Sequence, residues 1–339
     1  MRVSDRTTVR NFLKYLDNAK TKTADTNERI ASGNRFKRIS DDVSAGTRVL
    51  RVRSDLAKTE EHYDNVKAIN EQMATTETTM MSISDILVDV HSKKVIRALD
   101  DTAGEAGRNA LANEIKAMRE EILQFANTKY GTFYVLGGST ATAPPFTLGT
   151  NGELLYNKVS VDNILYDEIN GHYYDSDSGN PIPMDDPVYA DIGIGIRMQG
   201  SDVESDTAFK MSYSGLEVLG FGVNSDGISK NVYNQLAEIE KAIRANDMEK
   251  LRAYDNELVL ATDKLTANLT DIGAKTNFLD TIQKGLENRI DSFNSQVNTF
   301  MGINDAEEAM NQTMNDYVLK AILQLGSNIL PMSLMDYLR

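Results

Sequence analysis

The chain has 339 residues, 41% of them hydrophobic, which is enough to bury a core and to form two or three domains. It contains no cysteine, so disulfide frameworks, thiolate metal sites and cysteine nucleophiles are excluded. The net charge is -14 and residues 151–230 alone carry fourteen acids against four bases, which argues against nucleic-acid binding because that role needs a dominant basic face.

The first thirty residues are polar and basic, with a sparse apolar set of Val9, Phe12, Leu13 and Leu16. They contain no signal-peptide core and no run long enough to span a bilayer, so we expect neither cleavage nor membrane insertion. A helix with so few apolar side chains buries too little surface to offset its ordering entropy. We therefore expect this segment to be mobile in the free monomer and to become helical when neighbouring copies cover it.

A structured elbow is predicted next, between residues 29 and 46. Gly33 is typical of a helix stop, and Ser40, Asp41 or Asp42 is typical of the cap of a following helix. A long helix then fits residues 49–90, where apolar side chains recur at alternating steps of three and four without proline or glycine. Met73, Met80, Met81 and Met118 are interpreted as core filler at helical spacing.

The long helix needs a partner, because its narrow apolar stripe would otherwise lie in water. The same spacing recurs over residues 251–300, so the two distant segments are predicted to form one core. A second helix is expected around residues 111–125, a strand and glycine turn over 130–138, and a return helix over 232–243 that opens near Asp226. A last helix with a broader apolar face begins near Asn304.

Residues 147–228 are rich in glycine and aspartate, with alternation such as Ile192, Ile194, Ile196 and Met198 that predicts half-buried strands. The predicted fold is α+β: an elongated antiparallel helical bundle or coiled coil built from both chain ends, with an inserted small β-rich domain. We divide it into terminal helices (1–42 and 303–339), a helical rod (43–130 and 228–302) and a β-rich insertion with its connecting hairpin (131–227).

No residue pattern points to catalysis, a cofactor or a metal. His62, His91 and His172 lie far apart in the sequence, and Asp175–Asn180 lacks the later ligands of a calcium loop, so an acidic turn is the favoured interpretation. Gly193–Arg197 is too short for a dinucleotide loop and is interpreted as strand. We expect a protein that is not an enzyme.

Three sets of residues carry a resemblance to a known family. Ser32, Gly33 and Arg35, followed by Asp41 and Asp42, resemble the amino-terminal signature of the flagellin superfamily. The passage from Leu123–Thr128 through an aromatic strand and Gly137–Gly138 to Pro145–Phe146 is similar to the hook-associated protein type 3 branch of that superfamily. The ending Leu323–Leu334 resembles the terminal signature of the family.

The resemblance implies a structural subunit at the junction between flagellar hook and filament, exported without a cleaved signal peptide and located outside the cell. It implies three kinds of partner: copies of itself in a ring or tubular layer, a hook-side junction protein together with flagellin, and an export chaperone at the carboxyl-terminal helix. Self-assembly is expected through the terminal apolar faces, represented by Leu13, Leu16, Ile30, Met314, Tyr317, Ala321 and Leu325.

Two alternatives stay open at this point: a flagellin that forms the filament itself, and a secreted adhesin or enzyme displayed on helical ends. The terminal faces also allow an intramolecular hairpin that stays monomeric. We favour packing between subunits because the amino-terminal face is too sparse to be stable alone.

Overall fold

The structure of the chain is a computed structural model. The structure describes residues 2–100, 104–139, 143–150, 152–168, 171–182, 187–193, 195, 197–199, 202–203 and 208–335.

The chain divides into two compact units, and each is described by itself. Unit 1 comprises Met1–Glu60 and Asn288–Arg339, and unit 2 comprises Glu61–Glu287. Two long helices, α2 (Val43–Asp89) and α7 (Met248–Met301), contribute a segment to each unit. The boundary therefore lies within these helices, whereas the sequence suggested divisions at 42/43 and 302/303. The start of α2 groups with the chain ends because it packs against the elbow residue Phe36.

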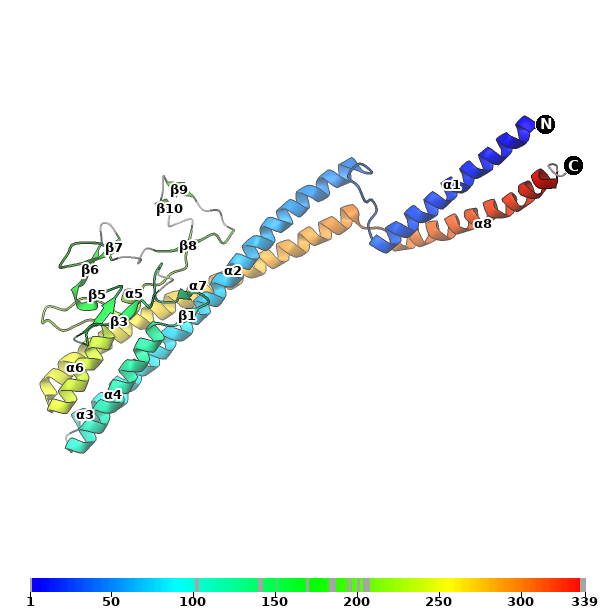
Figure 1. The fold of residues 1–339 in the computed structure, drawn as a ribbon. Helices are drawn as coiled ribbons and strands as arrows, with labels where there is room; N and C mark the ends of the chain where they lie inside the picture. Colours follow the sequence, from blue (N-terminus) through cyan, green and yellow to red (C-terminus); the bar gives the residue numbers. More distant parts are fainter. Residues whose placement is uncertain are drawn as a thin grey trace. The chain divides into compact units, whose positions relative to one another are not determined.

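Unit 1 also contains the two terminal helices, α1 (Arg2–Ser32) and α8 (Asp305–Met335). They lie side by side, with both chain termini at the same end of the pair (Figure 1). Pairs of contacting residues show that the two helices are antiparallel: Arg29 meets Glu308, whereas Phe12 meets Gly326.

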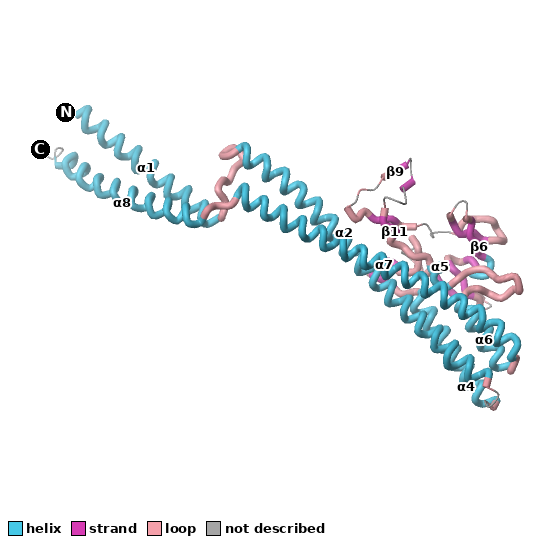
Figure 2. Tube along the Cα trace, turned by 180° about the vertical axis from the view of Figure 1, so that it is seen from behind, coloured by secondary structure: helices cyan, strands magenta, loops and turns pink. Residues whose placement is uncertain are grey.

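The core of the rod is a seam between α2 and α7, which run side by side in both views (Figures 1 and 2). On α7 a buried leucine or isoleucine recurs at every seventh position: Leu251, Leu258, Leu265, Ile272, Leu279 and Leu286. This strict repeat of 3.5 residues per turn keeps one edge of the helix against its partner. In unit 2 the bonds from Tyr63 to Glu287 and from Asn70 to Asp280 fix an antiparallel register.

Helix α2 continues into a π-helical turn, η1 (Val90–Val95), and a last α-helical turn, α3 (Ile96–Leu99), so it extends beyond the predicted end at residue 90. α4 (Glu105–Ala126) folds back along it, joined by an ion pair of 2.6 Å between Lys94 and Glu114. α6 (Val232–Ala245) packs against α4. Asn231 caps α6, because its side chain accepts a hydrogen bond from the backbone N–H of Tyr233, so the helix begins after Asp226, Gly227 and Ser229, which were predicted to open it.

The insertion consists of small antiparallel sheets. The strands are β1 (Lys129–Tyr130), β2 (Phe133–Tyr134), β3 (Phe146–Leu148), β4 (Leu154–Tyr156), β5 (Val159–Ser160), β6 (Ile164–Asp167), β7 (His172–Asp175), β8 (Tyr189–Ala190), β9 (Met198–Gln199), β10 (Asp202–Val203) and β11 (Phe209–Lys210). β3, β4 and β5 form a three-stranded sheet, and the other strands pair as β1 with β2, β6 with β7, β8 with β11 and β9 with β10. A 3-10 turn, η2 (Val161–Asn163), and a short helix, α5 (Gly215–Leu219), complete the insertion.

Among the described residues of the strand predicted over 192–198, Ile192, Gly193, Gly195 and Arg197 are not strand, so the prediction is wrong there, whereas Met198 pairs in β9. Gly193 and Gly195 have φ of +84° and +86°, a left-handed backbone that interrupts an extended strand. The expectation for Ile194 and Ile196 lies outside the described residues. The interpretation of Met81 as core filler is also wrong, since its side chain points outward while the neighbouring Met80 is buried.

A clasp of three side chains joins the insertion to α7. The hydroxyl of Tyr213 donates to Asp271 at 2.9 Å, and the ammonium of Lys275 bonds both Asp271 at 2.8 Å and the Tyr213 oxygen at 3.2 Å. Burial, followed by the bond to Asp271, raises the pKa of Tyr213. Burial acts to raise the pKa of Asp271, but hydrogen bonds from Lys275 and Tyr213 outweigh this effect, so the pKa of that carboxyl is lowered. The clasp therefore joins the ion pair between Asp271 and Lys275 to the buried ring of Tyr213.

The predicted α+β class is confirmed: both chain ends supply long helices, and the middle supplies small antiparallel sheets. The signal that located the helical body was the alternating three-four spacing. The buried positions of α2 largely follow it, whereas on α7 the buried positions are seven residues apart and the apolar positions between them are partly buried.

Replacing a seam leucine should destabilise unit 2 strongly. Leu265→Ala removes a side chain with no exposed surface and leaves a cavity, so we expect the free energy of unfolding to fall by about 2–5 kcal/mol. Leu260→Ala is the matched control on the same helix, because Leu260 is 55% exposed and should change stability by less than about 0.5 kcal/mol. Urea unfolding followed by circular dichroism measures both, and equal effects would contradict the seam.

Candidate assembly surfaces

The elbow joins α1 to α2 and is stitched to the turn between α7 and α8. Gly33 ends α1 with a φ of +67°, as predicted for a helix stop. The Ser32 hydroxyl accepts a weak bond of 3.3 Å from the backbone N–H of Asn34, and Asn34 forms an isolated β-bridge with Gly302. The N–H of Arg35 donates to the carbonyl of Met301 at 2.7 Å. These backbone bonds join the α1–α2 connection and the α7–α8 connection into one ordered corner of unit 1.

Asp42 is the residue that caps α2. Its Oδ1 accepts from the backbone N–H of Ala45 at 2.9 Å, and its Oδ2 pairs with the guanidinium of Arg35 at 2.8 Å. Asp41 instead accepts from the backbone N–H of Arg38, and this bond is the main reason that the pKa of Asp41 is lowered. The signature residues therefore do separate tasks: Gly33 stops a helix, Asp41 closes the turn, and Asp42 with Arg35 starts the next helix.

A small apolar cluster lies under this turn. Phe36, Ala45 and Val49 are buried together, with Phe300 and Met301 packed against them. The guanidinium of Arg48 lies 5.8 Å from the centre of the Phe300 ring, a cation–π contact. The sequence signal for this cluster was available, because Phe36 is the one aromatic residue inside the signature. The sequence placed its partner Phe300 only in the apolar pattern of residues 251–300, not in this cluster.

The contact between α1 and α8 is largely polar. Three side-chain bonds cross it: Arg29 to Glu308 at 3.2 Å, Asn315 to the buried Thr26 at 3.0 Å, and Gln312 to Asn27 at 3.1 Å. Near the open end the ring of Phe12 packs on Gly326, where an added Cβ would come within 2.3 Å of the ring. The pair thus has little buried apolar surface to hold it together.

Most apolar side chains of the terminal helices face away from this contact. On α8, Met310, Met314 and Tyr317 follow one helical face, and Met314 and Tyr317 are 67% and 74% exposed. Leu323, Leu325 and Val318 are also exposed, as are Leu13 and Tyr15 on α1. Exposed apolar side chains that share a helical face are typical of protein interaction sites.

The residues chosen from the sequence for assembly divide into two groups. Leu13, Ile30, Met314, Tyr317 and Leu325 are exposed, whereas Leu16 and Ala321 are half-buried. The sequence also placed Met310 and Val318 on the apolar face of the last helix but did not choose them for assembly, and it missed Tyr15 and Leu323 as exposed apolar positions. Met310 lies four positions before Met314, so helical spacing could have identified it for assembly. Leu323 does not fit that spacing, so the sequence held no such signal for it.

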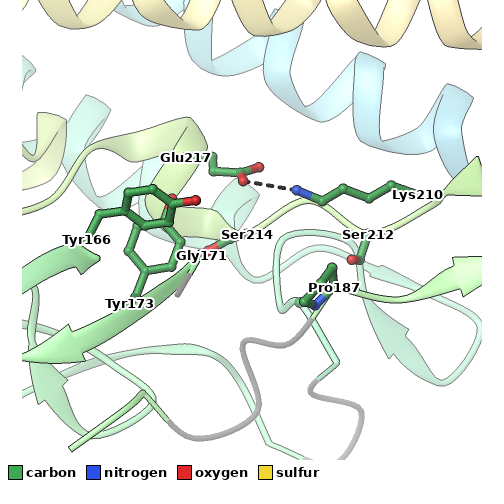
Figure 3. Close-up of a pocket in the computed structure, with 9 residues that line it drawn as sticks. Tyr166, Gly171, Tyr173, Pro187, Lys210, Ser212, Ser214 and Glu217 are labelled. Carbon is green, nitrogen blue, oxygen red and sulfur yellow. Dashed lines mark hydrogen bonds and ion pairs between the residues drawn. The ribbon is translucent and has the colours of Figure 1, made fainter. Parts of the chain in front are cut away.

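The insertion contains a small cavity of about 70 Å³ (Figure 3). Tyr166 and Tyr173 lie on one side with ring centres 4.9 Å apart and ring planes tilted by 52°, and the ammonium of Lys210 pairs with Glu217 at 3.1 Å on the other. Lys210 and Glu217 neutralise one another, so the cavity presents no unpaired charge from this pair. It has room for about two water molecules, which is far less than a substrate pocket needs.

The histidines do not converge. His91 pairs with Asp255 at 2.8 Å, His62 packs against Gly193, and His172 lies in β7. Within the described part of the chain, no group of three histidine, aspartate or glutamate side chains is placed to hold a metal ion. Among the same residues, no helix is both long and apolar enough to cross a bilayer.

Comparison with known proteins agrees with the elbow and the fold. The family model for the bacterial flagellin N-terminal helical region matches residues 3–141. The chain is flagellin-like, and the resemblance predicted from Ser32–Asp42 and Leu123–Phe146 is confirmed. It is 21% identical to flagellar hook-associated protein 3 of Salmonella typhimurium, over 96% of this chain and 100% of that protein. It is 18% identical to flagellar hook-associated protein 3 of Escherichia coli, over 80% of this chain and 89% of that protein.

A solved structure shares the fold. It comes from a Vibrio parahaemolyticus protein described as a flagellar hook-associated protein. The two chains superpose with a TM-score of 0.57 and 16% identity, covering 77% of this chain and all of that chain. At this level of identity the likeness shows a shared fold.

Substitution of Asp42 should separate its two roles at the elbow. Asp42→Asn retains a capping side chain and loses the ion pair, which is exposed and worth at most about 1 kcal/mol. Asp42→Ala loses both contacts and should cost about 1 kcal/mol more in the stability of the first turn of α2. Hydrogen exchange of the amides of residues 44–47 measures the difference, and identical exchange in both variants would contradict the capping role.

Proposed function

We propose that this protein is a structural subunit of the bacterial flagellum, at the junction between the hook and the filament. The observation that carries the proposal is the similarity to flagellar hook-associated protein 3, which spans the full length of the Salmonella protein. The amino-terminal match to flagellin supports a subunit of the flagellar axis. The function is mechanical, and the small neutralised cavity in the insertion fits a protein without catalytic activity.

The exposed terminal faces supply the assembly mechanism. In an isolated chain, Met314, Tyr317 and Leu325 on α8 and Leu13 on α1 expose apolar surface to water. Burying such side chains against neighbouring copies stabilises an assembly by roughly 1.5–3 kcal/mol for each. Copies of the chain would therefore pack through α1 and α8 into a ring or tubular layer. Leu16, Ile30 and Ala321 belong to the same proposed contact, at its border with the α1/α8 pair.

The proposed partners follow from this place in the flagellum. A junction layer meets a hook-side junction protein on one side and flagellin on the other, so its contacts are heterologous. The chain would be exported unfolded without cleavage and would reach the outside of the cell. Before export, the apolar face of α8 would need cover, and an export chaperone at this helix would supply it.

Deleting the gene tests the proposal directly. Cells without the protein should build hooks but release flagellin subunits into the medium, and should be paralysed. Electron microscopy of the cells and immunoblotting of the medium measure both effects. Normal filaments on the deletion strain would overturn the proposed function.

Variants in the same strain test the terminal face. The unchanged chain should restore filaments, whereas the double variant Met314→Glu and Tyr317→Glu should not, because buried unpaired carboxylates oppose packing. Ala309→Glu is the matched control, since Ala309 is exposed on α8 away from that face.

The terminal helices should be the least protected part of the free monomer. Their mutual contact is mainly polar, so local opening should cost little free energy. Hydrogen exchange of the purified monomer should be fast in residues 5–28 and slow in the seam around Leu265. Strong protection of residues 5–28 in a monodisperse monomer would contradict this expectation.

A further inference from the structure

Helix α2 has a second apolar stripe on the side opposite its core seam. In unit 1 the stripe consists of the exposed residues Val43, Thr47, Leu50, Ser54 and Ala57, at steps of four and three. We call these five residues the proximal stripe. Leu50, at the centre of this stripe, is 53% exposed. Solvation alone does not favour a leucine at this spacing on the outer side of a helix.

The charges around the proximal stripe are mainly positive. Residues 43–58 contain four bases, Arg48, Arg51, Arg53 and Lys58, and one acid, Asp55. Arg48 and Arg53 lean toward Phe300 and Met301. Arg51 and Lys58 border the stripe, are exposed, and have no ion-pair partner within the part of the chain that the structure describes.

In unit 2 the outer side of α2 carries a similar stripe with the opposite charge. Ala74, Thr78, Met81, Asp85 and Val88 are all exposed at the same kind of spacing, and we call them the distal stripe. Its central Met81 is 52% exposed. Residues 71–89 contain four acids, Glu71, Glu77, Asp85 and Asp89, and no base.

A groove of about 320 Å³ runs beside the distal stripe and shares Thr78 with it. The other lining residues are Thr75, Thr79, Ser82, Phe125 and Thr128. The four α2 hydroxyls donate to backbone carbonyls one turn earlier in the helix, at 2.8–3.0 Å. Their protons are therefore used, and the groove presents oxygen lone pairs and an aromatic ring. This surface fits a side chain with an apolar stem and a cationic end.

The outer surface of α2 thus carries two complementary halves. We infer that the proximal stripe of one copy packs against the distal stripe of a second copy of this chain, with Arg51 and Lys58 meeting Asp85, Glu77 and the hydroxyl-lined groove. A second copy is favoured over another partner because one chain presents both halves. Such a contact is heterologous, so it joins copies into a ring or helical layer. The inference rests on the proposed self-assembly but concerns the rod helices, not α1 and α8.

The absence of cysteine makes the contact measurable by cross-linking. A full-length chain with Leu50→Cys and Met81→Cys, expressed in the deletion strain, is treated on intact flagella with a short bis-maleimide. The two positions are too far apart on one helix to be joined within a chain. We expect a ladder of dimers, trimers and larger products. The matched control combines Leu50→Cys with Leu260→Cys, which is 55% exposed on α7, and should give at most dimers.

Charge reversal tests the pairing itself in the same cross-linking variant. Arg51→Glu with Lys58→Glu should lower the yield of the ladder about tenfold, because like charges then face one another. Adding Glu77→Lys and Asp85→Lys to the same chain exchanges the signs of both halves and should restore the yield. A yield that is unchanged by the first pair, or not restored by the second, would overturn the proposed pairing.

Filament retention separates this inference from the proposed function. Retained filaments without a ladder would overturn the stripe contact and leave the junction role standing. A cross-link from Leu50→Cys to a protein of another mass would also overturn it, since the partner would not be a second copy. If the deletion strain keeps its filaments, the junction role fails, whereas a ladder would still support the contact between copies.

Discussion

The seam between α2 and α7 is the constraint on which the rest of the molecule depends. Its buried leucines and isoleucine recur every seventh residue on α7, from Leu251 to Leu286, so the apolar edge never rotates away from its partner. Because the partners lie about two hundred positions apart in the chain, their pairing joins the two distant parts of the chain that frame unit 2. The insertion between the two helices is therefore held at both of its ends. Contacts such as the bond between Tyr213 and Asp271 hold it against α7.

Unit 1 shows the opposite balance of forces. Its terminal helices meet through bonds such as Arg29 to Glu308 and turn most of their apolar side chains outward. The elbow is well ordered by contrast, because Gly33, Asp42 and the cluster under Phe36 satisfy its backbone and bury its one aromatic ring. A rigid corner that carries a weakly held helical pair suits a subunit whose ends are completed by neighbouring copies.

The exposed surface of α2 extends the same principle to the rod. A helix in a bundle needs one apolar edge, whereas α2 has a core edge and an outer edge with Leu50 and Met81 at its centres. The change of sign along this outer edge, from Arg51 and Lys58 to Glu77 and Asp85, is a property of a single sequence segment. The two charged segments lie too far apart on one helix to pair with one another. In the proposed contact they pair between two copies.

The sequence by itself determined the helices, the antiparallel pairing of the chain ends, the glycine stop and the flagellin-like signature. These features depend on periodicity and on local backbone chemistry, which residues close together in the sequence determine. Only the tertiary structure decided that Met81 faces outward, that Gly193 and Gly195 interrupt the expected strand, and that the ring of Phe12 packs on Gly326. These outcomes depend on which distant atoms meet, and a spacing rule cannot distinguish two adjacent methionines when only one of them has a partner helix to pack against.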